Sequence, residues 1–469
     1  MPRQQRGNLM ASIQETWEKF EWTMSQVDLL QDGYEAVISQ YKANCDRFIL
    51  ELMQNQLEEC DEILRKNAYL RKDWVVVRKT ARTLQTRHGT LTYVRRYYRH
   101  QATGEYSYLV DHLVNLSPYD RVDPALRIHL AELGSEMSYR KSAQLACEGA
   151  VSHQTVMTAL RNLEFPEIPV MERKEDVPAI HIQVDEDHIT LQSRDMDAKK
   201  KGIVKLAVLH DPIKAKGKRR YIPSKFVMTD AADEKNEDFW ERVSYQLMER
   251  YGDLGCRPVY LHGDGASWIQ KGMEIIPNSH FVLDRYHLEQ ALRKACPQRL
   301  APDRWRRLHQ LLDQSAIEEM ALEIWACYED AGVCSQETAR ATIHYLVNHW
   351  EGIEIANDPK HTAGGSCAEG LVGHLLSERL STHAMSWSPE GAAQMASLRG
   401  FLQNGGQLTS TMFKKPTKVV QADIPMPDIK LKNFRFSTSP ETAPWTNRRG
   451  TALYRLQKTV FNGGLGRVH

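Results

Sequence analysis

The sequence predicts a mixed α/β protein in which a sheet-forming region follows a helical segment and a small β-rich segment. Three observations predict it. Residues 9–70 space their apolar side chains as a helix does, and residues 74–110 change to the alternation of strands. Residues 178–298 then alternate strand-like and helix-like runs, which is typical of an α/β sheet.

The composition indicates a globular protein without a membrane span. The chain has 469 residues, enough for about two to four domains with buried cores. No apolar run reaches the roughly 18 residues of a membrane helix, and the N-terminus leads into no signal-peptide core, so we expect a cytoplasmic location. The eight cysteines form no CxxC pair, which argues against a zinc ribbon or a disulfide framework. With a net charge of only +1, any DNA-binding surface must be local.

Two segments precede the α/β region. Residues 1–73 form a predicted helical region, which suits a helical hairpin or an oligomerisation arm. Residues 74–125 follow as a β meander rich in arginine and tyrosine, with a last strand expected at residues 106–110. Guanidinium groups grip phosphates, so this meander is a candidate DNA-binding sheet through Arg95, Arg96 and Arg99. The alternative is a solvated strand face whose tyrosines lie in the core.

Residues 126–165 have the spacing of a helix-turn-helix. One short helix is predicted at residues 138–146, a turn containing glycine follows, and Ser152 caps a second helix at residues 153–160. In that motif the first residues of the second helix reach base edges, and nearby cations contact phosphates. The candidate DNA-binding residues are His153, Gln154, Thr155 and Thr158 for bases, with Arg140 and Lys141 for phosphates. A pair of helices that only pack is the alternative.

The α/β region, residues 178–298, carries two acidic residues at informative places. The predicted strands are 179–192, 202–209, 220–229, 257–261 and 281–283, and the predicted helices are 236–251, one through Trp268 and one from His287. Alternation along the first strand puts Asp185 on its polar face. The glycines that flank Asp264 place its carboxylate at the C-terminal end of a strand, where open α/β sheets keep their chemistry.

A third acid follows far downstream. Residues 299–363 are helical in pattern and contribute no strand, so they are a predicted helical insertion. Residues 364–400 return to the α/β region with Glu369 in the first turn of a helix, and residues 401–469 form a basic tail that contains prolines. Three acids gathered on one sheet could hold two divalent metal ions, as enzymes that cleave and rejoin phosphodiesters do.

The run Asp264-Gly265-Ala266, then Pro277, then Asp284 and His287 three positions apart, resembles the DG…P…(C/D)xxH signature of Mutator-like DDE transposases. The whole chain more closely resembles the ISLre-type insertion-sequence transposases of bacteria. The resemblance implies a ribonuclease-H-like catalytic domain and a DNA transposase that cuts and joins the ends of an insertion sequence. It further implies Asp185, Asp264 and Glu369 as catalytic residues and metal ligands, with Asp284 and His287 as an accessory pair that positions DNA.

Several of these assignments keep a rival. Asp187 lies on the same strand face as Asp185. Glu369 fits the third position best because its helix looks like the family's final Glu helix; the other acids available are Glu351, Glu354, Glu378 and Glu390. For Asp284 and His287, the alternative is a capping carboxylate and a buried imidazole.

Carboxylate ligands without a cysteine or paired-histidine pattern favour Mg²⁺ or Mn²⁺ over zinc, and the chemistry that the resemblance implies uses two ions. The expected partners are double-stranded DNA, at element ends and target, and a second copy of the chain in a homodimer or higher synaptic complex. The expected location is the bacterial cytoplasm, on the nucleoid when DNA is bound. Two other classes compete: a non-catalytic helix-turn-helix DNA-binding regulator (a domesticated transposase) and a glycoside hydrolase, which the arginine-rich strands disfavour.

Overall fold

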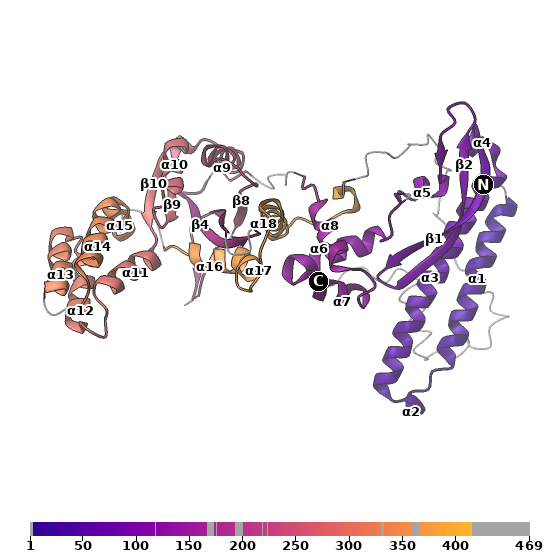
Figure 1. Ribbon diagram of the computed structural model, residues 1–469, viewed down its shortest axis with the longest axis horizontal. Coiled ribbons are helices and arrows are strands. Elements are labelled where there is room, and N and C mark those ends of the chain that lie inside the picture. Colours follow the sequence, from indigo (N-terminus) through magenta and orange to yellow (C-terminus); the bar gives the residue numbers. More distant parts are fainter. Residues whose placement is uncertain are drawn as a thin grey trace.

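The computed structural model describes residues 3–414, except 118, 167–172, 175, 193–199, 218, 223, 330–332 and 359–364. Most of the basic tail expected at residues 401–469 therefore lies outside the described residues. Figure 1 shows an elongated molecule with a long helical hairpin at one end, a group of helices at the other and the main sheet between them. None of the described helices combines the length and the apolar character that crossing a membrane requires.

The N-terminal helical region is confirmed as a hairpin. Its helices are α1 (Arg3–Ser25), α2 (Leu29–Asp32), α3 (Tyr34–Lys66) and α4 (Ala68–Arg71). The long helices α1 and α3 are held together by aromatic packing of Trp17 and Phe20 against Phe48, with ring centroids 5.9 and 4.6 Å apart. Such pairs add to the apolar area that the two helices bury.

A small antiparallel sheet packs on α3. Its strands are β1 (Trp74–Thr86), β2 (Gly89–His100) and β3 (Tyr106–Ser107), in the order β1-β2-β3. The prediction of a strand through residue 110 was wrong, because the chain turns into the short helix α5 (Leu109–Leu113). Leu109 and Val110 are fully buried there, in one cluster with Leu64, which a strand at the edge of the sheet would not allow.

The helix-turn-helix spacing is confirmed as local structure. Helix α6 (Pro124–Glu136) is followed by α7 (Tyr139–Cys147) and α8 (His153–Arg161). Ser138 and Ser152 accept hydrogen bonds from backbone N–H groups of the first turns of α7 and α8, which satisfies donors that helix starts leave free. The turn between them places Glu148 and Gly149 at positive φ (52° and 80°), where glycine costs nothing.

The main sheet has five strands: β4 (Ile180–Leu191), β5 (Lys200–His210), β8 (Lys225–Thr229), β9 (Val259–Gly263) and β10 (Ser279–Leu283). Their order is β10-β9-β4-β5-β8; β4, β5 and β8 are antiparallel neighbours, and β9 and β10 run parallel to β4. The run expected as one strand at residues 220–229 instead forms two strands in different sheets, because β7 (Arg219–Tyr221) pairs with β6 (Lys214–Lys216).

One face of the main sheet carries a large apolar core. Helices α9 (Asn236–Tyr251), α10 (Ser267–Ile275) and α11 (Arg285–Ala295) accompany the strands, with the turn η1 (Leu254–Cys256) before β9. Ile182 and Val184 of β4 belong to the same buried cluster as Trp240 of α9. The expected helical insertion consists of α12 (Pro302–Asp313), α13 (Ile317–Glu329), α14 (Gln336–Asn348) and α15 (Trp350–Asn357), and their apolar faces extend this core.

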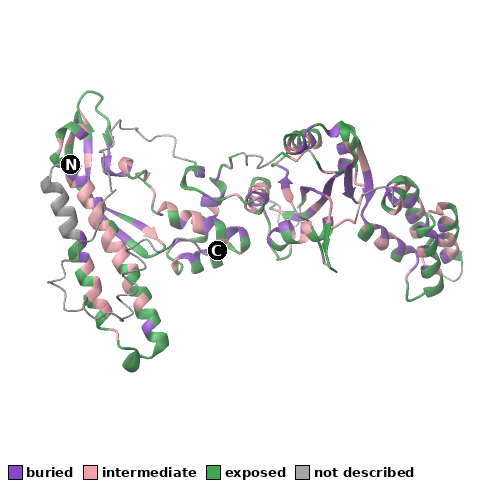
Figure 2. Ribbon diagram, turned by 180° about the vertical axis from the view of Figure 1, so that it is seen from behind, coloured by how far each residue is buried: buried purple, intermediate pink, exposed green. Residues whose placement is uncertain are grey.

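The opposite face of the sheet is covered by the segment after the insertion. It contains α16 (Ala368–Val372), the π-turn η2 (Gly373–Ser377), α17 (Glu378–Leu380), α18 (Pro389–Gln403) and η3 (Ser410–Met412). Figure 2 shows the strands of the main sheet mostly buried, whereas the helices around it expose their outer sides. A second buried cluster joins Val208 of β5 and Leu398 of α18 to Val156 of α8. The helix-turn-helix therefore shares a hydrophobic core with the main sheet.

Candidate active site

Asp185 lies in the middle of β4, with its side chain on the face that α16 covers. The expected alternation is confirmed: Ile182 and Val184 enter the apolar core, whereas Asp185 faces the other way. Its carboxylate is 7% exposed and accepts a hydrogen bond from the Glu186 N–H at 2.8 Å. The pKa of Asp185 is raised to about 6, first because burial penalises its charge and further because the carboxylates of Asp264 and Glu369 lie nearby.

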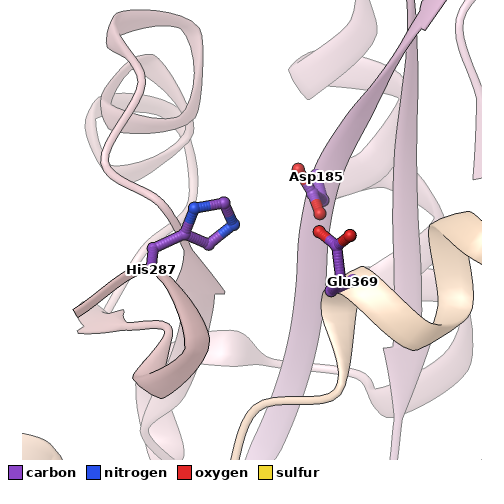
Figure 3. Close-up of side chains that lie close together, drawn as sticks. All are labelled: Asp185, His287 and Glu369. Carbon is purple, nitrogen blue, oxygen red and sulfur yellow. The ribbon is translucent and has the colours of Figure 1, made fainter. Parts of the chain in front are cut away.

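Glu369 reaches Asp185 because a polar residue of β4 holds the loop before α16. The Gln183 amide oxygen accepts hydrogen bonds from the Ser366 hydroxyl at 3.1 Å and from the Cys367 N–H at 3.0 Å. This clamp fixes the start of α16 against the strand two residues from Asp185. Glu369, in the first turn of α16, stays exposed and directs its carboxylate toward that of Asp185 (Figure 3).

Asp264 stands one residue beyond the end of β9, on a turn that only glycine permits. Gly265 has φ +88°, and a Cβ there would lie 2.1 Å from His349 Nε2. The Asp264 carboxylate accepts a hydrogen bond from the Ala266 N–H at 2.9 Å, and its carbonyl accepts one from the Tyr345 hydroxyl at 3.0 Å. The strand end and the insertion helix α14 thus fix Asp264 jointly.

Asp284 and His287 lie one helical turn apart but have different surroundings. Asp284 is 3% exposed; its carboxylate caps α11 through the Tyr286 N–H at 2.8 Å and accepts a bond from Ser366 at 3.0 Å. Asp284 therefore caps a helix, which was the alternative interpretation of this residue. His287 instead turns its imidazole toward Asp185 and Glu369 (Figure 3). Its Nε2 is buried and has no hydrogen-bond partner within the described part of the chain.

Asp185, Glu369 and His287 form a group that could hold a metal ion. One ligand atom from each lies within 4.8 Å of the other two. Asp264 lies beside this group, close enough for its charge to raise the pKa of Asp185. The sequence motif pointed to His287 as an accessory residue, and the structure places its imidazole in the same group as Asp185 and Glu369.

The rival acid Asp187 is engaged elsewhere. Its carboxylate accepts hydrogen bonds from Ser377 at 3.0 Å and from Ser381 at 2.8 Å, which hold the segment after α16 against β4. Asp187 thus anchors this segment while Asp185 faces Glu369. Among the described acids, the rivals for the third position stay outside the group; these are Glu351, Glu354, Glu378 and Glu390.

The residues expected to read DNA on the helix-turn-helix are largely accessible. His153, Gln154 and Thr158 are exposed on α8, and so are Arg140 and Lys141 at the start of α7. Thr155 is half-buried, and its hydroxyl bonds with that of the capping Ser152 at 3.1 Å. Polar side chains at the starts of α7 and α8 therefore face solvent and are accessible to a partner.

Two of the three arginines expected to bind DNA through the β meander are buried ion-pair residues, which corrects that expectation. Arg95 pairs with Asp111, and Arg96 pairs with Asp61 and with Glu62 at 2.6 Å each. The side chains of both arginines are below 8% exposed, so their charges serve the fold. Arg99 is exposed and remains accessible to a partner.

Known proteins place the chain in a family. The model of the uncharacterised protein family UPF0236 matches residues 31–416. A UPF0236 protein of Caldanaerobacter subterraneus subsp. tengcongensis is 32% identical over 397 residues, covering 84% of this chain and 83% of the relative, and its name joins eleven locus designations. Another UPF0236 protein of that organism, whose name joins four, is 32% identical over 398 residues, covering 84% and 83%. The chain therefore belongs to the UPF0236 family.

Proposed function

We propose that this protein is a DDE transposase of the ISLre type, which binds the ends of an insertion sequence and catalyses DNA strand cleavage and strand transfer. The observation that carries the proposal is the meeting of Asp185 and Glu369, 184 positions apart, with Asp264 close by at the end of the neighbouring strand. Three strands, a helix, a strand, a helix and a further strand is the order expected of a ribonuclease-H-like domain, and the main sheet follows that order. This order supports assigning the main sheet to that fold.

The donor set fits divalent ions. Asp185 and Glu369 offer hard oxygens, and the unpartnered Nε2 of His287 offers a nitrogen on the same side, a combination that suits Mn²⁺ at least as well as Mg²⁺. Asp264 would help to hold a second ion. When bound, such ions activate water or a DNA 3′-hydroxyl and stabilise the leaving oxygen. The chain itself orients the ligands: Gln183 fixes the loop before Glu369, and Gly265 fixes the turn at Asp264.

The names of the relatives support a mobile element. One UPF0236 protein of Caldanaerobacter subterraneus subsp. tengcongensis carries eleven locus designations and another carries four. A mobile element that copies itself produces many genes for one protein at different loci of a genome. Applied to this chain, the pattern favours transposition over a regulatory role, which needs a single gene. A protein that acts on chromosomal DNA in this way would work in the bacterial cytoplasm. Bringing two element ends together would require at least two copies of the chain.

The test is cleavage and joining of a labelled duplex that spans the end of the element encoding this chain, with Mg²⁺ or Mn²⁺. We expect metal-dependent products from the wild type and a loss of at least about 100-fold in rate for Asp264→Asn, because a carboxylate that would help to hold an ion is removed while the fold is kept. Asp303→Asn, at an exposed position of α12, is the matched control and should react as the wild type does. Equal rates for Asp264→Asn and wild type would refute the assignment. Binding without cleavage by either would favour the DNA-binding regulator.

The helix-turn-helix should supply phosphate contacts. Replacing Arg140 and Lys141 together by alanine is expected to reduce the slope of log affinity against log salt by about 1.8, because each lost phosphate contact contributes about 0.9. Affinity measured by fluorescence anisotropy over a salt series gives the slope. Arg306→Ala, at an exposed cation of α12, is the control. An unchanged slope in the double variant would place the DNA on another surface.

A further inference from the structure

A cleft of about 480 Å³ opens beside the candidate site, between α11 and α14. Asp264 and His287 lie at its inner end, where the Tyr345 hydroxyl holds the Asp264 carbonyl. The remaining lining residues are Gln290, Ala291 and Lys294 on α11 and Glu337, Thr338, Ala341 and Thr342 on α14. Spacings of three and four positions put each set on one helix face. The cleft therefore leads from the acidic residues outward along two helices.

Two polar side chains in this cleft have no polar partner among the described residues. Lys294 is exposed and makes no ion pair with any described residue, and the half-buried amide of Gln290 makes no hydrogen bond with one. The small side chains of Ala291 and Ala341 line the cleft between the helices without filling it. A free ammonium suits a phosphate, and a free amide suits the edge of a base. The one carboxylate of the outer part is Glu337, which is exposed.

The dimensions of the cleft suit a single strand of DNA better than a duplex. A volume of about 480 Å³ equals a cube roughly 8 Å on a side, smaller than the roughly 12 Å width of the major groove alone. Seven positions separate His287 from Lys294, about 10 Å along the helix, and a stacked strand advances about 3.4 Å per nucleotide. The cleft thus has room for a short single strand, about three nucleotides long.

We propose that the cleft between α11 and α14 holds a single-stranded segment of DNA next to the scissile phosphate, with Lys294 on a phosphate and Gln290 on a base edge. This inference rests on the proposed function and adds a positioning role: the helical insertion keeps the duplex open at the point of cleavage. Opening a duplex costs a few kcal/mol, which such contacts would offset. Lys294 and Gln290 are then positioning residues, distinct from the acids that surround the phosphate.

Base unstacking tests the inference without chemistry. The fluorescent adenine analogue 2-aminopurine, placed at each position around the cleavage point, brightens when it leaves the stack. With EDTA present, binding of the wild-type chain to the element-end duplex should raise fluorescence at about three adjacent positions only. Gln290→Ala combined with Lys294→Ala should bind the duplex but leave the signal at the level of free duplex. Arg293→Ala is the matched control, because this neighbouring cation on α11 lies over the ring of Trp305 instead of lining the cleft.

Rescue separates this role from a general loss of structure. The double variant should cleave paired duplex about tenfold more slowly or worse, and should recover the wild-type rate on a duplex with unpaired bases at the brightened positions. Bound DNA without any brightening, or a double variant that unpaired bases do not rescue, would overturn the inference. The two proposals fail separately: brightening without cleavage by the wild type would refute catalysis alone, and cleavage without brightening would refute the single-strand cleft alone.

Discussion

Asp185→Asn is expected to stabilise the metal-free fold at pH 8, although it removes a proposed catalytic residue. The wild type must keep a buried carboxylate charged beside the carboxylates of Asp264 and Glu369, and this raises the pKa of Asp185 to about 6. From an ordinary value of 3.8, the difference corresponds to about 3 kcal/mol of unfolding free energy. An amide at this position avoids that cost. Active sites commonly trade stability for function in this way.

The contribution of Asp185 to the stability of the fold changes with pH in a defined direction. Because folding raises this pKa, the protonated carboxyl favours the folded state, so its contribution is complete below about pH 4 and is lost as the pH rises through about 6. Thermal melting of the two proteins in EDTA should therefore give equal midpoints near pH 4. At pH 8 the variant should melt roughly 6–12 °C higher.

Divalent ions should reverse this order. Mn²⁺ at pH 8 is expected to raise the midpoint of the wild type, since an ion that binds only the folded chain stabilises it, and to raise that of Asp185→Asn much less. Asp303→Asn, at an exposed site, should melt as the wild type does under every condition. A variant that melts at or below the wild-type midpoint at pH 8 in EDTA would show that the buried charge of Asp185 does not destabilise the fold.

Asp111→Asn is expected to cost the N-terminal sheet about 3–5 kcal/mol, because it leaves two buried guanidinium groups without their counter-charge. Asp111 is fully buried; it pairs with Arg82 at 2.8 Å and with Arg95, and it accepts a hydrogen bond from Tyr93 at 2.9 Å. Burial and the charge of Arg82 lower the pKa of Arg95 to about 10, so Arg95 stays charged near neutral pH. Hydrogen exchange of the amides in β2 should accelerate roughly 10²- to 10⁴-fold.

A compensated variant distinguishes charge from shape. Replacing Asp111 by leucine together with Arg82 and Arg95 by methionine removes all three charges at once, and exchange in β2 should return toward the wild-type rate. If the triple variant exchanges as fast as Asp111→Asn, the ion pairs contribute through their hydrogen bonds and packing instead. The DNA affinity of the triple variant should equal that of wild type, because these arginines have no surface to offer.

Local patterns predicted the elements better than they predicted partners. Helix α9 has the expected bounds, residues 236–251, since acids in its first turn and Gly252 after its last turn mark its ends. Alternation along β4 likewise put Asp185 on the correct face. The burial of Arg95 and Arg96 was missed because strand alternation does not say what covers a face; their acidic partners come from α3 and α5.

In the candidate site too, local patterns predicted individual residues but not their contacts. The glycine pattern around Asp264 and the small-residue loop before Glu369 are local signals, and each marks a residue near the site. The sequence did not predict that Asp284 contacts Ser366 whereas His287 faces the carboxylates. A spacing of three positions is compatible with either direction for each side chain. The cleft along α11 could not be predicted from the sequence either, because its second wall comes from α14, and the sequence does not show that the two helices lie side by side.

The segment after the helical insertion has a consequence for how the protein becomes active during synthesis. It provides Glu369, and it also holds the helix-turn-helix: the Gln394 amide donates to the carbonyl of Leu163 at 2.8 Å, and Leu163 bridges to Phe413. A ribosome adds about 5–20 residues per second, so roughly 10–50 s pass between completion of α8 and emergence of this segment. Until this segment emerges, a nascent chain has neither a supported helix α8 nor a complete group of acidic residues, and a product truncated within the insertion would lack both.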